Sequence, residues 1–417
     1  MSRLYKDICS HRTLYNAWRK VRSSAAFSNS EEIRLEAEAF ESRLPDSLTE
    51  IQRALSKKEF VFLQQTGVAQ QKASGKVRPL VLAPIPNRIV QRALLDALQR
   101  RVKFVQQVLA IQWSYGGLPN KRVSMAIEDA KAAMRAGARF HIRSDIPAFF
   151  TKIDKERVRT ILAPHIRCPD TLDLFDAAVK TDLANIDDLR RRELDNHFPI
   201  GIIGVAQGSP LSPLLANIYL ADFDALMNSK DVVCLRYIDD FLILGKSQSD
   251  VDRAFNRAQK ALAKLSLNAY DPTTNRDKAS RGPVNKGFDF LGCNVSPGLI
   301  QPSEATRKRF KTKLSTEFEI TKRCLHYNAK YSDGENKYSY ASMLYRIDKI
   351  ILGWGKAFSF CNGSQTMAAM DAFISDQLMA LEKEKNNLLA KAAPSTRRRI
   401  LGIRLLTSTK APEPASS

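Results

Sequence analysis

The stretch LRYIDDFLIL, residues 235–244, places two adjacent carboxylates in the middle of an apolar run. The run begins at Val232 and resumes at Phe241, directly after Asp239 and Asp240. A buried carboxylate without a partner is unfavourable by several kcal/mol or takes up a proton. The pattern therefore predicts two strands joined by a tight turn that carries both acids.

A third acid lies near the end of another predicted strand. Residues 138–150, ARFHIRSDIPAFF, alternate as a half-buried strand does, with Phe140 and Ile142 on one face. The opposite face carries His141, Arg143 and Asp145. Because the chain turns at Pro147, Asp145 is expected near the carboxyl end of this strand.

The order of elements predicts one small mixed sheet, backed by helices, that holds all three acids. If the two strands are neighbours, the acids converge at one edge and repel one another unless cations neutralise them. Magnesium takes carboxylate and phosphate oxygens and keeps water ligands, so it suits this set. Two such ions about 3.5–4 Å apart would activate a 3′-hydroxyl and stabilise a leaving pyrophosphate. The alternative is that Asp239 and Asp240 only cap a tight turn.

The charge balance indicates a polyanionic partner. The 417 residues include 65 Lys and Arg against 44 Asp and Glu, a net charge of +21. Such an excess favours nucleic acid binding, and a solvated basic surface is the alternative. No segment approaches the roughly 18 apolar residues of a membrane span, so we expect a cytoplasmic protein with no membrane partner.

The cysteines indicate neither a zinc site nor disulfides, because they are scattered without a CxxC pair. We expect free thiols at Cys9, Cys168, Cys234, Cys293, Cys324 and Cys361.

Helices are expected over residues 1–65, with Ser47 and Glu50 spaced as a capping box. A short strand is expected near residues 80–82 and an amphipathic helix from about Asn87. Another helix should run from about 124 to 136. The Ser-Pro pairs at 209–210 and 212–213 predict a helix start, and residues 303–393 are expected to be helical.

Several motifs, in chain order, resemble those of reverse transcriptases in their bacterial group II intron form. YIDD resembles the YxDD box, and AQGSPLSPLLANIYL resembles the QG(S/T)P segment. RSDIPAFFTKID resembles the motif of the first catalytic aspartate, and GKVRPLVLAPIPNRIVQRAL resembles the fingers motif. GFDFLG is similar to the hairpin after the palm, and LYNAWRKVRS and RIDKIILGWGKAF are similar to the N-terminal and thumb or maturase regions.

The resemblance, which runs from about residue 10 to 360, implies an α+β right-hand polymerase with fingers, a palm with a small antiparallel sheet, and a helical thumb. The implied domains are an N-terminal helical extension (1–65), fingers (66–135), a palm (136–298) with a fingers insertion at about 155–195, a thumb or maturase-like region (299–393), and a basic, partly disordered tail (394–417).

The resemblance also implies a role for each matching residue. The catalytic set is Asp145, Asp239 and Asp240. The metal-binding set is the same three residues with Ile146, beside which the backbone would meet the incoming triphosphate. The nucleotide-binding set is Lys72, Arg78, Phe150, Gln207 and Gly208, with Lys76 as an alternative to Lys72. Phe150 matches the steric gate, where an aromatic ring rejects a ribose 2′-OH by clash. Tyr237 would lie at the primer end, and Lys278 would protonate the pyrophosphate, although NRDKAS departs from the family's usual segment there.

The implied activity is RNA-directed DNA polymerase, extending a DNA or RNA primer on an RNA template with dNTPs and two Mg²⁺ ions, or Mn²⁺ in their place. The alternatives are an RNA-dependent RNA polymerase, and a group II intron maturase that binds RNA and assists splicing. No segment after about residue 400 resembles the endonuclease domains of mobile intron proteins. We therefore expect a stand-alone bacterial enzyme, retron-like or of the antiphage defence kind, with a dedicated noncoding or intron RNA as a further partner.

Overall fold

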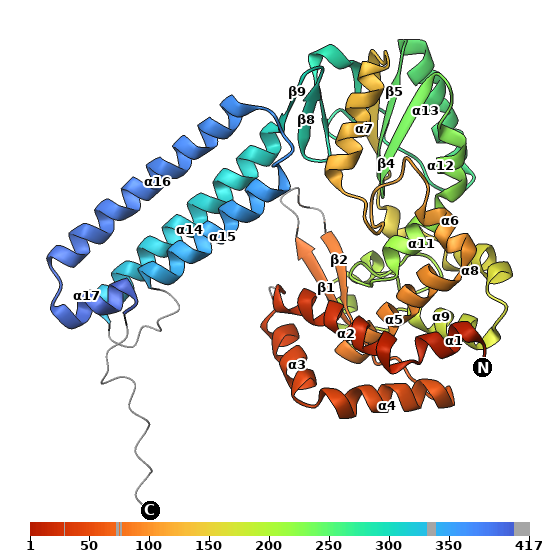
Figure 1. Cartoon of the computed structure of the whole chain (residues 1–417), viewed down its shortest axis with the longest axis horizontal. Coiled ribbons are helices and arrows are strands. Elements are labelled where there is room, and N and C mark those ends of the chain that lie inside the picture. Colours follow the sequence, from red (N-terminus) through yellow and green to blue (C-terminus); the bar gives the residue numbers. More distant parts are fainter. Residues whose placement is uncertain (29, 72–74, 76, 332–338, 404–417) are drawn as a thin grey trace, which may run out of the picture. The chain divides into compact units, whose positions relative to one another are not determined.

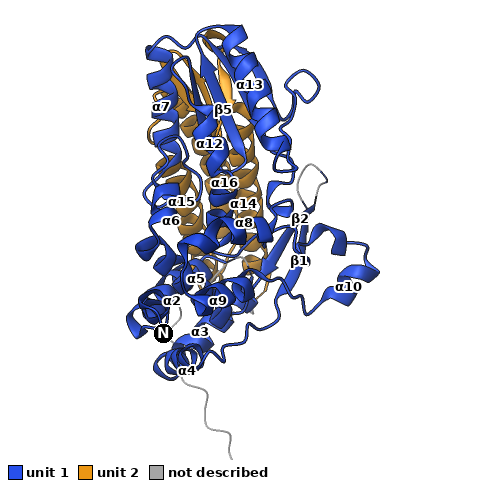
Figure 2. Ribbon diagram, turned by 90° about the vertical axis from the view of Figure 1, so that its right-hand side faces the viewer, with its two compact units in different colours: residues 1–283 blue, residues 284–417 orange. Residues whose placement is uncertain are grey.

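The structure is a computed structural model that describes residues 1–28, 30–71, 75, 77–331 and 339–403. The chain divides into two compact units, residues 1–283 and 284–417 (Figure 2). Within the described residues, no helix is both long and apolar enough to cross a membrane. The cysteines are free thiols, as predicted.

The first unit begins with the predicted N-terminal helices, which pack on a long helix from further along the chain (Figure 1). These helices are α1 (Arg3–Ile8), α2 (His11–Ala26), α3 (Glu31–Ser42), α4 (Leu44–Lys57) and α5 (Ile85–Arg101). The predicted capping box is wrong, because α4 begins at Leu44 with Pro45 in its first turn, so Ser47 lies inside the helix.

The predicted strand near residue 80 belongs to an antiparallel hairpin of β1 (Thr66–Gln71) and β2 (Val77–Leu82). The sequence did not indicate β1. The expected helices follow as α5, α6 (Lys103–Leu109) and α7 (Val123–Arg135), and Gly137 ends α7 with a left-handed φ of 106°.

The first unit contains a four-stranded antiparallel sheet in the strand order β4-β5-β3-β6. Its strands are β3 (Phe140–Asp145), β4 (Val232–Tyr237), β5 (Asp240–Gly245) and β6 (Ser280–Pro283). One expectation for β3 is wrong: His141 is buried rather than on an open face. The reason is that β3 is an inner strand, and Ser280 of β6 contacts the imidazole ring.

Helices connect and cover this sheet: α8 (Lys155–Leu162), α9 (Pro169–Val179), α10 (Ile186–Arg191), α11 (Ser212–Tyr219), α12 (Ala221–Met227) and α13 (Gln248–Ala263). Helix α13 packs on β3 and β5, and α12 packs on β4. A helix does begin at the second Ser-Pro pair, but Ser212 is the first residue of α11 rather than its cap. The Ser212 hydroxyl instead donates to the Ala206 carbonyl (2.6 Å).

The second unit has a three-stranded antiparallel sheet and four helices in its described residues. The strands are β7 (Phe288–Phe290), β8 (Cys293–Ser296) and β9 (Leu299–Pro302), and the helices are α14 (Glu304–Lys330), α15 (Tyr340–Ala357), α16 (Ser364–Ala390) and α17 (Pro394–Leu401). The hydrophobic core between these helices includes three buried residues of α14, namely Phe310, Leu314 and Phe318.

Candidate active site

The predicted acidic turn is the connection between β4 and β5. Tyr237 pairs with Asp240, so Ile238 and Asp239 alone form a two-residue loop. Ile238 has a left-handed φ of 61°, which is rare for a β-branched residue. Backbone strain of this kind persists only where surrounding contacts over-determine the conformation, and it concentrates at functional sites.

Two of the three predicted acids meet at this turn. Asp145 lies directly opposite Asp240 across the β3–β5 pairing, and the Ile146 amide donates to the Asp239 carbonyl (3.1 Å). The Asp145 and Asp239 carboxyl groups are close enough for each to affect the ionisation of the other. Burial, and then the charge of Asp145, raises the pKa of Asp239 to about 7. Burial also raises the pKa of Asp145.

The third acid has a different partner. Asp240 accepts two hydrogen bonds from the guanidinium of Arg143, from Nε and Nη2, both at 2.9 Å. This fork geometry is strong and orients both groups. Burial raises the pKa of Asp240, and the Arg143 charge opposes that rise. The structure therefore brings Asp145 and Asp239 together and pairs Asp240 with a cation of the protein.

The acid pair lies in a cavity of about 610 Å³ within the first unit. Predicted site residues that line it are Arg78, Asp145, Ile146, Phe150, Gln207, Asp239 and Lys278. The charge of Lys278 acts to lower the pKa of Asp145. Phe150 is half-buried, and its ring lies 5.8 Å from that of Phe149. The cavity thus combines two carboxylates with two cations and the aromatic rings of Phe149, Phe150 and Tyr270.

Residues 70–295, more than half of the chain, match the family described as reverse transcriptase (RNA-dependent DNA polymerase). The chain belongs to the reverse transcriptase family. The family, with the mixed helices and small antiparallel sheets, confirms the predicted fold class, an α+β right-hand polymerase. This family is in general dependent on divalent metal ions.

The curated relatives include an intron protein, so this reverse transcriptase has weak homology to an intron-encoded protein. It is 25% identical over 227 residues to an uncharacterized 91 kDa protein in cob intron of Schizosaccharomyces pombe, covering 54% of this chain and 26% of that protein. It is 26% identical over 263 residues to Protein YkfC of Escherichia coli K12, covering 53% of this chain and 64% of that protein. The chain spans less than two thirds of the length of either relative.

Solved structures similar to this reverse transcriptase include an apo telomerase from Candida tropicalis, with a TM-score of 0.39, 12% identity, and coverage of 58% of this chain and 55% of that one. A partial Cas6-RT-Cas1–Cas2 complex has a TM-score of 0.34, 20% identity, and coverage of 63% and 41%.

Other predicted residues of the reverse transcriptase lie elsewhere or outside the described residues. Lys72 and its alternative Lys76 fall outside them. Gly208 has a φ of 120°, and a Cβ there would lie 2.8 Å from the Val81 carbonyl oxygen, so a side chain is disfavoured at this position, and its place beside the nascent base pair stays a prediction. Tyr237 is half-buried at the end of β4 and does not line the cavity.

Sequence reasoning assigned no role to four residues at this site. Arg143 shares a strand face with Asp145, and this alternation was the available signal for it. Tyr270 donates its amide to the Asp145 carbonyl (3.1 Å), and Asn196 and His197 line the cavity. These three come from loops and a short turn, for which no periodic signal exists.

The acid pair of the reverse transcriptase fits a divalent cation. Two partly buried carboxyl groups that repel each other when ionised are neutralised by a bound cation, and their oxygens are the donors that Mg²⁺ prefers. In the described parts of the chain, no group of three or more His, Cys, Asp and Glu is arranged to hold a metal ion. The three-carboxylate site therefore stays a prediction.

Proposed function

We propose that the chain is an RNA-directed DNA polymerase that extends a primer with dNTPs. The observation that carries this proposal is the placement of Asp145 and Asp239 together in a cavity that Arg78 and Lys278 also line. Such a cavity suits a substrate that brings both phosphates and divalent ions, as a dNTP does.

Asp145 and Asp239 would hold the ions, with Asp240 as a further ligand once it leaves Arg143. Bound Mg²⁺ supplies Lewis-acid activation of the primer hydroxyl and neutralises charge on the leaving pyrophosphate. In the absence of the ions, the raised pKa of Asp239 favours its protonated form, which lessens the repulsion between the two carboxyl groups.

The cations of the cavity would bind the triphosphate. Arg78 offers a planar fork of donors for phosphate oxygens, and Lys278 offers a compact charge that can also supply a proton to the pyrophosphate. We propose Gln207 and Gly208 beside the nascent base pair, where Gly208 permits close approach, and Tyr237 at the primer end.

Phe150 would select deoxyribose. Its half-buried ring lines the cavity, and its backbone carbonyl accepts from the Val205 amide (2.7 Å), so the ring has a fixed base. Phe150→Ala should lower the dNTP/rNTP preference by about 10-fold or more, because the clash with a 2′-hydroxyl disappears. An unchanged ratio of the two kcat/KM values would remove this role.

The direct test is primer extension on an RNA template with the wild-type chain and Asp145→Asn. We expect Mg²⁺-dependent dNTP incorporation by the wild type and none by the variant. Preferred incorporation of rNTPs would indicate an RNA-dependent RNA polymerase instead. No incorporation by the wild type, with RNA-dependent splicing retained in Asp145→Asn, would indicate a maturase.

We propose the domain boundaries given above, with residues 299–393 as a nucleic-acid-binding thumb. Its support is a groove of about 830 Å³ in the second unit, lined by Arg307, Lys308, Lys311 and Arg323 among others. Because phosphate contacts release counterions, RNA affinity should fall steeply with salt concentration.

For the biological setting, we propose a bacterial enzyme of the intron-like lineage that acts in antiphage defence with a dedicated RNA. Homology to an intron protein supports the lineage. Phage plating on cells that carry the wild type or Asp145→Asn tests the defence role, and equal plating would reject it.

A further inference from the structure

A buried arginine lies directly before the acidic turn. Arg236, on β4, has only 1% of its side chain exposed, and its partner Asp224 of α12 has 4% exposed. Arg236 Nε lies 2.6 Å from Asp224 Oδ1, and Nη2 lies 2.5 Å from Oδ2. Burying an ion pair rarely adds net stability over well-packed apolar side chains, so its presence calls for a role other than stability.

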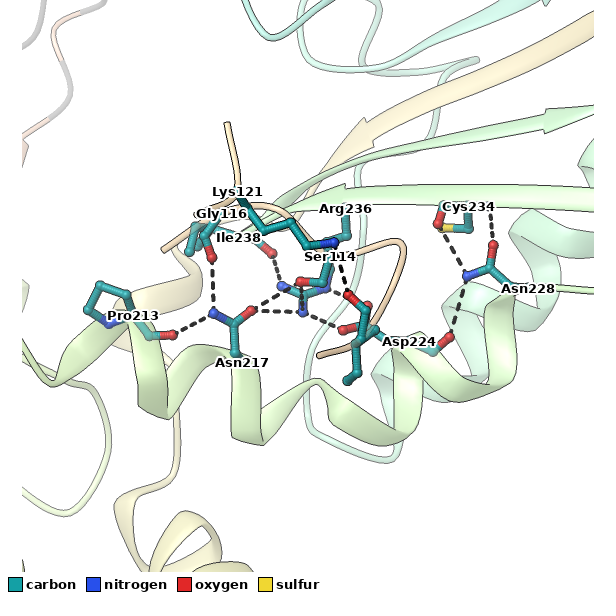
Figure 3. A network of polar contacts seen from close by, with 11 residues as sticks. Ser114, Gly116, Lys121, Pro213, Asn217, Asp224, Asn228, Cys234, Arg236 and Ile238 are labelled. Carbon is teal, nitrogen blue, oxygen red and sulfur yellow. Dashed lines mark hydrogen bonds and ion pairs between the residues drawn. The ribbon is translucent and has the colours of Figure 1, made fainter. Parts of the chain in front are cut away.

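The remaining donors of this guanidinium extend to the turn. Figure 3 shows Arg236 between Asp224, Asn217 and the Ile238 backbone. Arg236 Nη1 donates to the Ile238 carbonyl (2.9 Å), and Nη2 also donates to Ser114 Oγ and Asn217 Oδ1 (both 2.9 Å). The arginine thus fixes the peptide group that immediately precedes Asp239.

A second contact confines the same turn. The segment before Gly116 pairs with β4, through Arg236 N to Trp113 O (2.8 Å) and Tyr115 N to Arg236 O (2.9 Å). Asn217 Nδ2 donates to the Gly116 carbonyl (3.0 Å), which ties this segment to the arginine. A Cβ on Gly116 would lie 2.6 Å from the Ile238 amide nitrogen, so the two backbones are in close contact.

We propose that Arg236 is a positioning residue for the catalytic turn, an inference that rests on the polymerase function proposed above. Arg236 and the Gly116 segment hold Ile238 at its left-handed φ and thereby set where the Asp239 carboxylate meets Asp145. The Asp239 carbonyl, bonded to the Ile146 amide, completes the link from the buried ion pair to the end of β3.

Only arginine satisfies this geometry. Its five donors lie in one plane, and here they serve Asp224, Asn217, Ser114 and the Ile238 carbonyl together. A lysine could keep the charge pair with Asp224, but its single ammonium cannot reach all of these acceptors. Arg236→Lys should therefore not restore the positioning.

The decisive variant is the double replacement Arg236→Met with Asp224→Leu. It removes both charges at similar volume, which buried sites tolerate. Ser114 Oγ and Asn217 Oδ1 remain hydrogen-bonded to each other (3.3 Å). We expect Tm close to wild type and kcat lower by about 100-fold, because the turn is misplaced. KM for dNTP should change less than about threefold, since the triphosphate contacts are intact.

A readout without catalysis separates this inference from the polymerase proposal. Hydrogen exchange at the Ile146 amide reports its bond to Asp239 and should be faster in the double variant than in the wild type. If the wild type incorporates no nucleotide, the polymerase proposal fails and the exchange result alone decides the positioning role. An Ile146 exchange rate in the double variant equal to that of the wild type would overturn the positioning role. A kcat that recovers under conditions that restore Tm to the wild-type value would also overturn it.

Asn228→Ala is the matched control, because Asn228 clamps the same strand at Cys234, away from the turn. It donates to the Cys234 carbonyl (3.2 Å) and accepts from its amide (2.8 Å). This variant should lower Tm without altering kcat or Ile146 exchange. If the double variant does not fold, Asn217→Ala is the second test. It keeps the ion pair and should still lower kcat at constant KM, and an unchanged kcat would overturn the inference.

Discussion

Two of the tight hairpin turns in the described residues begin with the same kind of residue, β4–β5 in the first unit and β7–β8 in the second. Each has a two-residue loop whose first residue is a branched apolar side chain at positive φ, Ile238 at 61° and Leu291 at 50°. The β7–β8 loop continues with Gly292 at φ 80°, which matches a type I′ turn. The β4–β5 loop continues with Asp239.

The difference between these turns concerns what supports them. Gly292 completes its turn with no acid in the loop, and its carbonyl accepts from the Ser303 amide (2.9 Å). The β4–β5 turn is held by a buried guanidinium and carries Asp239, whose pKa is raised by burial and by the charge of Asp145. A tight turn at a strained apolar residue therefore does not need acids, and turn formation alone does not account for Asp239.

The largest expected effect separates the two hairpins by activity. Asp239→Asn should lower kcat for dNTP addition by about 10²–10³-fold, because it removes a charged group at the reacting centre. Asp289→Asn, in the β7–β8 hairpin, removes an exposed acid bonded to Asn294 (2.8 Å) and should change kcat by less than about threefold. Single-turnover primer extension measures both, and equal losses would break the comparison.

A smaller expected effect distinguishes the β4–β5 and β7–β8 hairpins by how closely other residues pack against their turns. Gly116→Ala places a Cβ 2.5 Å from Ile238 Cγ1 and 2.9 Å from the Tyr237 carbonyl carbon, so the backbone must move. We expect a loss of about 1–3 kcal/mol in the free energy of unfolding and a lower kcat.

Gly292→Ala is the counterpart in the second hairpin. Its Cβ meets only Thr306 Oγ1 closely, at 3.2 Å, and the main penalty is the left-handed φ, about 1–2 kcal/mol. Denaturant unfolding compares the two variants. A Gly116→Ala chain with wild-type kcat would show that the turn tolerates displacement.

The smallest expected effect depends on pH. The pKa of Asp239 is about 7 in the folded protein against an ordinary 3.8, so between these values the folded state binds more protons than the unfolded state. The free energy of unfolding therefore falls as pH rises through this window. Asp239→Asn avoids that loss.

Without divalent ions, Asp239→Asn should raise Tm at pH 8 by roughly 2–4 °C for each kcal/mol gained, and by almost nothing at pH 4. Thermal unfolding at both pH values measures the difference. Adding Mg²⁺ should reduce it, because a cation stabilises the ionised pair of the wild type. If the Tm difference between Asp239→Asn and the wild type did not change with pH, it would contradict the raised pKa of Asp239.

Much of the fold and site was predictable because it depends on local patterns. Alternation identified β3 and the hairpin around Asp239, and helical periodicity identified the N-terminal helices and α7. The likeness of YIDD and RSDIPAFF to family motifs predicted from the sequence alone that Asp145 and Asp239 belong to the active site. The pairing of β3 with β5 then placed these two residues together.

The rest depends on contacts between distant segments. That Asp240 pairs with Arg143, that His141 is buried and that Arg236 reaches the Ile238 carbonyl all require knowing which strands are neighbours. Local residue patterns specify strands and turns, because side-chain alternation and φ preferences act over a few residues. Burial and charge pairing are properties of the packed chain, and so only the tertiary structure decided which acids lie together in the cavity and which one pairs with an arginine.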